Sequence, residues 1–193
     1  MKNILFLDMD GVLNSSYLTR KWFDKKFQEL EDSLFYSSFE DIRIAARSQF
    51  NKYTCNSKEF IFPELASLLN EVIKAVDLKI VWSTTWRRLP EYYDIENARK
   101  MLNKRGLIGS ALIDYTPVLD NPYISSLSGK RIEEIEYYIH HNNLNITFND
   151  KLAAIDDLNL SALEKLNIKF FPTEFEYGIT EKIKNDMIDY YSK

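Results

Sequence analysis

A short apolar run at residues 4–7 is the feature that most constrains the fold of this chain. The run lacks the polar alternation of a half-exposed strand, which predicts a buried strand of a parallel sheet. It ends in Asp8 and Asp10, and Gly11 then lets the chain turn sharply. Ligands of parallel α/β sheets bind just beyond the carboxyl ends of the strands. The two aspartates therefore lie where a ligand site is expected.

Two carboxylates that converge on one point repel each other unless a cation lies between them. Mg²⁺ is commonly held by one or two carboxylates together with water and a substrate phosphate. An ionised aspartate beside a bound phosphate can also attack phosphorus and form an aspartyl phosphate. The alternative is a solvated turn in which Asp8, Asp10 and Gly11 are only turn formers. This motif alone does not decide between the two interpretations.

A second apolar run, residues 78–82, ends in Ser83 and Thr84. A hydroxyl and free backbone N–H groups at a strand end can hold a phosphoryl oxygen. Ser83 is the first hydroxyl after the run and is the expected phosphate ligand, with Thr84 as the alternative. Arg87 follows, and its forked guanidinium could reach a second phosphate or a carboxylate of the substrate.

A third apolar run, residues 152–155, ends in Asp156 and Asp157. An Asp pair alone is weak evidence, but here it follows a strand in a chain whose first strand also ends in aspartates. One of these carboxylates would supply the missing part of an octahedral Mg²⁺ site. Right-handed crossovers bring the carboxyl ends of parallel strands to one edge of a sheet. We therefore expect the three polar strand ends to meet.

A basic pair, Lys130 and Arg131, lies in the first turn of a helix that we expect Ser128 to cap. The helix dipole disfavours cations there, so a basic residue at this position invites a functional explanation. Arg131 stands four residues before Ile135 of the expected buried stripe, which favours it on helical phase. The alternative is that both are surface charges.

Together these patterns resemble the motifs of the haloacid dehalogenase (HAD) superfamily of phosphotransferases. Residues 8–14 resemble the first motif, and Ser83 stands where the second motif has a Ser or Thr. The third motif is a Lys or Arg at the start of a helix, with Lys as the commoner type, and the paired aspartates 156–157 match the fourth. The resemblance implies an α/β fold, a three-layer Rossmann-like parallel sheet with a small helical cap inserted after strand 1.

The resemblance also implies a reaction, the Mg²⁺-dependent hydrolysis of a phosphomonoester through an aspartyl-phosphate intermediate. Asp8 would be the nucleophile, and Asp10 would be the general acid and base. The charge would be neutralised by the metal and by Lys130 or Arg131, between which the sequence leaves the choice open. The implied residues are Asp8, Asp10, Lys130 and Arg131 for catalysis, Ser83, Thr84 and Arg87 for substrate binding, and Asp8, Asp10 (through its backbone carbonyl), Asp156 and Asp157 for the metal.

Residues 15–61 do not follow the pattern of a strand-and-helix unit. We interpret them as a small helical cap inserted into a core domain of residues 1–14 and 62–193. Two helices, residues 16–31 and 38–50, carry apolar stripes. In the superfamily such insertions close on the substrate, whereas the alternative is that these are ordinary packing helices.

Residues 20–26 of the insertion mix basic and aromatic side chains. Such a segment could touch a phosphodiester chain or a base, although a solvated helix face with a buried aromatic edge is the favoured alternative. The net charge of −4 argues against nucleic-acid binding through bulk charge and leaves a local basic groove open.

Periodicity also predicts the elements that frame the motifs. They are helices at residues 63–76, 91–104 and 178–191, a short helix at 161–166, a mixed segment at 107–113, a loop at 114–127 and a last strand at 168–171.

The remaining sequence properties limit the cellular setting. A length of 193 residues suits one domain with a small subdomain. Cys55 is the single cysteine, so no intramolecular disulfide can form, and we expect no disulfide-linked partner. No apolar run approaches the roughly 18 residues needed to span a membrane. With no recognisable signal peptide, the expectation is a cytoplasmic protein.

The hydroxyl-rich turn that runs into Trp86 and Arg87 gives a closer resemblance, to the phosphatase-like domains of bacterial RNA-repair enzymes. This resemblance implies a nucleotide or nucleic-acid end phosphate as substrate. A small-metabolite phosphatase, acting on a sugar or nucleotide, fits the modest cap equally well. A non-catalytic binding protein of the HAD fold is a third interpretation, against which the four intact motifs argue. The sequence does not indicate an oligomeric state.

Overall fold

The computed structural model describes residues 1–32, 38–53, 61–119, 121–141, 146–147 and 149–193. Five strands form one sheet in the order β3-β2-β1-β4-β5, and every neighbouring pair is parallel. The predicted α/β class with a parallel sheet is therefore confirmed. The strands are β1 (Asn3–Leu7), β2 (Leu78–Trp82), β3 (Leu112–Tyr115), β4 (Lys151–Asp156) and β5 (Lys169–Pro172).

The first strand lies at the centre of the sheet, between β2 and β4. Leu7, its last residue, is in register with Trp82, the last residue of β2. On the other side Leu7 is in register with Ile155, one residue before the end of β4. The carboxyl ends of these three strands therefore lie side by side, and the polar residues that follow them share one edge.

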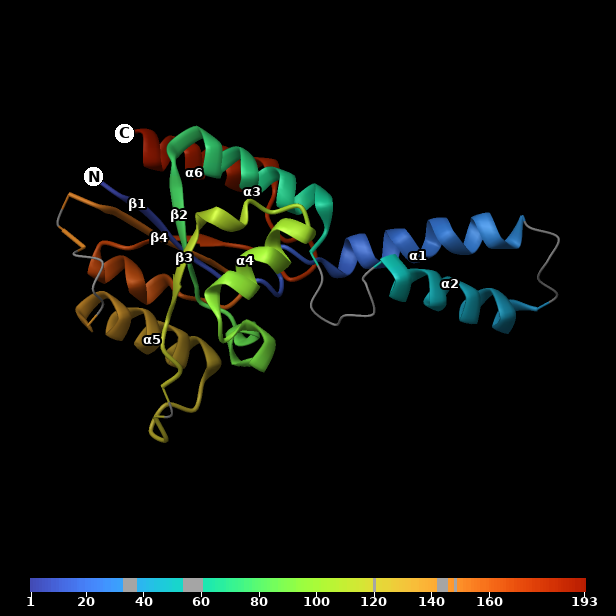
Figure 1. The fold of residues 1–193 in the computed structure, drawn as a ribbon, viewed down its shortest axis with the longest axis horizontal. Helices are drawn as coiled ribbons and strands as arrows, with labels where there is room; N and C mark the ends of the chain where they lie inside the picture. Colours follow the sequence, from blue (N-terminus) through green and yellow to red (C-terminus); the bar gives the residue numbers. More distant parts are fainter. Residues whose placement is uncertain (33–37, 54–60, 120, 142–145, 148) are drawn as a thin grey trace.

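Helices cover both faces of the sheet and complete the three predicted layers (Figure 1). Successive side chains of a strand point to opposite faces. In β1, Leu5 and Leu7 belong to one buried apolar cluster, and Ile4 and Phe6 belong to the other. The first cluster includes residues of α3 (Pro63–Val76), α4 (Ile95–Lys104) and α6 (Glu181–Ser192), and the second includes residues of α5 (Leu127–His141) and η4 (Ser161–Leu166).

The predicted helix at residues 91–104 begins later than expected. Asp94 caps α4 by accepting a hydrogen bond from the Glu96 N–H at 3.0 Å, so the α-helix starts at Ile95. The residues before this cap form 3-10 turns, which helical periodicity does not separate from an α-helix. The short 3-10 helices of this half of the chain are η1 (Thr85–Arg88), η2 (Pro90–Tyr92) and η3 (Gly109–Ala111).

The prediction that Ser128 caps α5 is wrong. The helix already begins at Leu127, and the Ser126 Oγ accepts a hydrogen bond from the Gly129 N–H at 3.1 Å. The segment predicted as a loop at residues 114–127 also starts too early, since its first two residues complete β3. Both errors are shifts of one or two residues at the ends of elements.

The last helix begins three residues after its predicted start at Gly178. Gly178 instead occupies a tight turn, with a φ of 70° and an ideal Cβ position 2.6 Å from the Val12 carbonyl oxygen. α6 then starts at Glu181, because the Thr180 hydroxyl accepts a hydrogen bond from the Ile183 N–H at 3.3 Å.

The insertion contains α1 (Ser16–Glu31) and α2 (Phe39–Tyr53), close to the predicted helices. The two helices lie side by side and extend away from the sheet (Figure 1). A small apolar cluster, separate from the two clusters of the core, holds the two helices together. The expectation that this helical hairpin closes over the substrate as a cap stays a prediction. The members of this hairpin cluster are Leu30, Ile42 and Ala46, with Phe23, Phe27 and Ala45 packed against them.

Candidate active site

The site is built on backbone hydrogen bonds between the ends of neighbouring strands. The Asp8 N–H donates to the Ile155 carbonyl at 3.1 Å, and the Ser83 N–H donates to the Leu7 carbonyl at 2.9 Å. These bonds continue the sheet pairing by one residue past the end of β1. They hold the residues after β1, β2 and β4 next to one another.

Three carboxylates gather at this edge. Asp8, Asp156 and Asp157 each offer an oxygen atom, and these oxygens lie within 4.8 Å of one another. Gly11 makes room for the third: its φ is 71°, and an ideal Cβ would lie 2.7 Å from the Asp157 Cγ. A residue with a side chain would be strained at position 11 and would collide with Asp157.

Arg131 of α5 joins the two buried carboxylates. Its Nη1 lies 3.0 Å from the Asp8 Oδ1 and 3.3 Å from the Asp156 Oδ2. Lys130 is half-buried and forms no ion pair within the residues that the structure describes. Arg131 shares the buried face of the helix with Ile135, as the helical phase of the sequence suggested. Of the basic pair, Arg131 is the residue that reaches the acidic cluster.

The pKa values of the acidic cluster reflect negative charge in a dry environment. Burial raises the pKa of Asp8 to about 6, and the Arg131 guanidinium opposes this rise only in part. Burial, and then the Asp8 charge, raises the pKa of Asp156 to about 7. Burial also raises the pKa of Asp157. Carboxylates that resist ionisation together are stabilised by a cation, and three hard oxygen donors fit Mg²⁺.

Asp10 is held apart from this cluster through both of its carboxylate oxygens. The Asn14 Nδ2 donates to one oxygen at 2.7 Å, and the Trp86 indole Nε1–H donates to the other at 3.0 Å. Asn14 in turn accepts a hydrogen bond from the Gly11 N–H at 2.8 Å. The Asp10 side chain is not part of the three-carboxylate group, and its expected backbone contact to a metal stays a prediction.

The two hydroxyls after β2 take different positions. The Thr84 side chain hydrogen-bonds to Asp8 and lowers the pKa of that carboxyl. Ser83 is buried, and its Oγ lies 3.4 Å from the Thr116 Oγ1. Thr84, the alternative candidate, is thus the hydroxyl in contact with the acidic cluster, while the role of Ser83 as a phosphate ligand stays a prediction.

Arg87 points inward in this structure. Its guanidinium forms an ion pair with Glu134 of α5 and a hydrogen bond with the Thr84 carbonyl. A longer hydrogen bond, 3.3 Å, reaches the Pro117 carbonyl. The side chain is buried, so its two terminal nitrogens support the turn after β2 instead of extending toward a second phosphate.

Sequence reasoning missed Glu134, Asn14 and the indole of Trp86 as parts of the site. Glu134 follows Arg131 by three residues on the buried face of α5, and a buried Glu at that spacing was a usable signal. Asn14 and Trp86 gave no comparable signal, because their contacts with Asp10 depend on the folded loops.

The fold and the site together define the class of protein, the HAD superfamily. The fold is a parallel α/β sheet with an Asp-x-Asp motif after its central strand, and the same edge carries a hydroxyl, an arginine and an Asp pair. Within that class, residues 4–183 match the family described as "HAD domain in Swiss Army Knife RNA repair proteins", and the chain belongs to this family. No curated protein and no solved structure matches the chain. Among the described residues, no helix is both long and apolar enough to cross a membrane.

Proposed function

We propose that this protein is a Mg²⁺-dependent phosphomonoester hydrolase that acts on the terminal phosphates of RNA through an aspartyl phosphate on Asp8. The observation that carries the proposal is the buried pair of Asp8 and Asp156, joined by Arg131 beside Asp157. Membership of the HAD superfamily supports a hydrolase, and the family description supports a role in RNA repair.

In the first step, an Asp8 carboxylate oxygen attacks phosphorus, and the bond between phosphorus and the ester oxygen breaks. Asp10, oriented by Asn14 and Trp86, gives its proton to the leaving oxygen. Arg131 offsets negative charge next to the nucleophile. The products of this step are the free alcohol and an aspartyl phosphate.

In the second step, a water oxygen attacks the phosphorus of the aspartyl phosphate, and the bond to the Asp8 oxygen breaks. Asp10 takes up the water proton and so returns to its starting state. Inorganic phosphate leaves. One residue thus serves first as acid and then as base.

Asp8, Asp156 and Asp157 are the residues that would hold Mg²⁺. When bound, the ion supplies positive charge that lowers the repulsion between an anionic nucleophile and an anionic phosphate. Thr84, in contact with Asp8, keeps the nucleophile oriented toward this point.

Hydrolysis of a generic aryl phosphate, with and without Mg²⁺, tests the reaction. We expect Asp8→Asn to lower kcat by about a thousandfold or more, because it removes the nucleophile. Asp186→Asn, at an exposed position of α6, is the matched control and should keep wild-type activity. Activity of Asp8→Asn near wild type would remove Asp8 from its role.

A substrate panel tests the choice of RNA ends. The panel holds mononucleotides, oligonucleotides with a 3′- or a 5′-phosphate, and sugar phosphates. We expect the highest kcat/KM for a phosphorylated oligonucleotide. A clear preference for sugar phosphates would be consistent with the proposed reaction but would contradict the proposed RNA substrate.

A further inference from the structure

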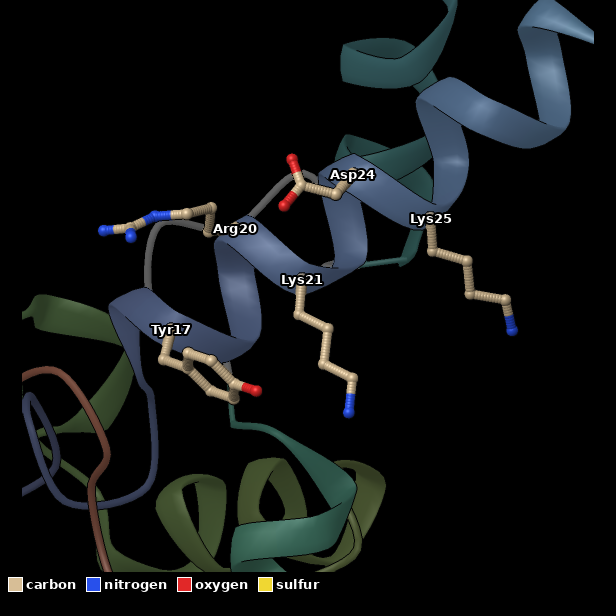
Figure 2. Close-up of a pocket in the computed structure, with 5 residues that line it drawn as sticks. All are labelled: Tyr17, Arg20, Lys21, Asp24 and Lys25. Carbon is tan, nitrogen blue, oxygen red and sulfur yellow. The ribbon is translucent and has the colours of Figure 1, made fainter.

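One exposed face of α1 carries a row of three side chains, Tyr17 followed by the cations Lys21 and Lys25. Tyr17, Arg20, Lys21, Asp24 and Lys25 follow helical spacing and line one surface hollow (Figure 2). Figure 2 shows Tyr17, Lys21 and Lys25 directed to the same side, with Asp24 and Arg20 turned to the other. Positions 17, 21 and 25 are one helical turn apart, about 6 Å along the axis.

The cations of this row are largely available. Lys21 is exposed and forms no ion pair within the described part of the chain. Lys25 is exposed and lies 4.0 Å from Glu29, which bonds more closely to Lys26 at 2.7 Å. A loose exposed pair of this kind contributes little and yields readily to a stronger anion.

An exposed aromatic pair adjoins the start of the row. The rings of Tyr17 and Tyr177 lie 5.7 Å apart, with exposed fractions of 43% and 46%. Two backbone bonds fix this arrangement: the Tyr17 N–H donates to the Glu176 carbonyl at 3.0 Å, and the Ser16 N–H donates to the Phe175 carbonyl at 3.4 Å. Aromatic faces beside a line of cations are the features that bind single-stranded nucleic acid.

The row begins next to the catalytic residues. Asn14, which holds Asp10, is followed directly by Ser15, the cap of α1. Tyr17 follows Asn14 by three positions, a chain span of about 11 Å at most. A strand whose terminal phosphate lies at Asp8 can therefore continue onto the face of α1.

We propose that the α1 face, with Tyr17, Lys21 and Lys25, binds the backbone and bases of a single-stranded RNA whose terminal phosphate enters the site. This inference rests on the proposed function and extends it from the phosphate to the strand behind it. Helical spacing places the ammonium groups of Lys21 and Lys25 on successive turns of one side, a separation suited to neighbouring phosphates of a polyanion. An acidic peptide would use the cations but leave the aromatic pair without a base to stack on.

Binding of a short fluorescent RNA without any terminal phosphate tests the surface apart from the chemistry. The variant Lys21→Gln/Lys25→Gln removes two charges from the row. Lys74→Gln/Lys104→Gln is the matched control: it also removes two exposed lysine charges, which lie in the last turns of α3 and α4 and not on the hairpin. Fluorescence anisotropy over a range of salt concentrations gives Kd and its salt dependence.

We expect the row variant to weaken RNA binding and to reduce the slope of log Kd against log salt by about 1.4, because each of the two phosphates that the lysines neutralise accounts for about 0.7. Tyr17→Leu should weaken binding by about fivefold or more, because it removes base stacking. The control variant should bind within about twofold of wild type. In hydrolysis, the row variant should raise KM for the phosphorylated oligonucleotide only, with aryl phosphate turnover unchanged.

Equal RNA binding by the row and control variants would overturn the inference, as would binding of single-stranded DNA or polyglutamate in preference to RNA. These outcomes leave the proposed function standing if aryl phosphate is hydrolysed. Conversely, the protein could bind RNA through the row and show no phosphatase activity. That result would support the proposed RNA-binding surface and contradict the proposed reaction.

Discussion

Asp10 is positioned by two side chains, Asn14 and Trp86, that each bond to one of its carboxylate oxygens. The indole N–H is a donor without acceptor capacity, so its bond favours one orientation of the carboxyl. Trp86 also packs edge-on against Trp82, with ring centroids 6.4 Å apart. The indole therefore has a fixed place from which to orient the proposed acid and base.

Trp86→Phe keeps an aromatic ring and removes this donor. A hydrogen bond to a charged group contributes about 1.5–3 kcal/mol. We expect kcat for aryl phosphate to fall by roughly tenfold to a hundredfold, with a shifted pH profile and little change in KM. The control is Tyr115→Phe, which removes a hydroxyl bond to the Tyr92 carbonyl beside the same Trp82. A pH profile and a kcat equal to wild type would show that Trp86 does not orient Asp10.

The choice between the two cations of α5 is also a matter of single residues. Arg131→Met leaves Asp8 and Asp156 buried without their partner, which costs about 3–5 kcal/mol of stability and should lower kcat by at least about a hundredfold. Lys130→Met should change both quantities little. Urea unfolding and aryl phosphate kinetics measure the two effects. A larger loss for Lys130→Met would assign the role to the lysine instead.

The sequence indicated the acidic residues and the basic pair of Lys130 and Arg131 because each follows from a local rule, and the structure shows which of the two cations reaches the acidic cluster. Asp8 and Asp156 end apolar strands, and Arg131 lies in phase with the buried stripe of its helix. The contact of Trp86 with Asp10 spans 76 residues and that of Arg87 with Glu134 spans 47. Contacts at such separations depend on how loops fold against the sheet, and periodicity does not describe them.

At the scale of elements, the turn after β2 is tied to α5. Arg87 lies in η1 and pairs with Glu134, and the same arginine bonds to the Thr84 carbonyl. The helix that supplies Arg131 and the turn that supplies Thr84 are thereby held in one relative position. This ion pair links two parts of the site without lying among the acidic residues.

Glu134→Gln should destabilise the protein by about 3 kcal/mol or more, because it leaves the Arg87 charge buried and unpaired. The double variant Arg87→Met/Glu134→Leu should lose less, since no charge remains. Asp186→Asn, which breaks an exposed pair with Lys182, is the control and should cost under about 1 kcal/mol. Urea unfolding measures all three. If Arg87→Met raised KM and left the stability at the wild-type value, Arg87 would instead be assigned to binding of the substrate phosphate.

The elements themselves were predicted better than their ends. Apolar runs and helical stripes located four of the five strands and the six α-helices to within a few residues, since burial against the sheet sets those patterns. The strand β3 fell across the mixed segment and the segment predicted as a loop. Ends depend on single side chains such as Asp94 and Ser126, which compete with neighbouring candidates for the cap. The arrangement of the elements in space was the hardest property to predict from the sequence. Nothing in the apolar stripe of α1 indicates that the helical hairpin extends away from the core.

At the scale of the whole molecule, the acidic cluster makes stability depend on pH. The folded pKa values of Asp8, about 6, and Asp156, about 7, exceed the ordinary 3.8. The folded protein therefore binds protons more tightly than the unfolded chain. Without metal, the protonated forms of Asp8 and Asp156 contribute to the stability of the folded protein. This contribution is fully present below about pH 4 and is lost as the pH rises to about 7.

We expect metal-free Asp156→Asn to be more stable than wild type at pH 7.5, and this advantage should vanish near pH 4. Mg²⁺ should raise the Tm of wild type more at pH 7.5 than at pH 5, since it binds the ionised carboxylates. Thermal unfolding with EDTA or Mg²⁺ measures both effects. A Tm difference between wild type and variant that does not change with pH would contradict the raised pKa values.

Phosphorylation of Asp8 during turnover can be tested directly by one measurement. Wild-type protein is mixed with Mg²⁺ and an aryl phosphate, quenched in acid within the first turnovers, digested and examined by mass spectrometry. We expect a phosphoryl group on the peptide that contains Asp8, and none when Asp8→Asn is treated in the same way. Turnover that leaves this peptide unmodified, or that modifies another residue, would contradict the proposed phosphorylation of Asp8.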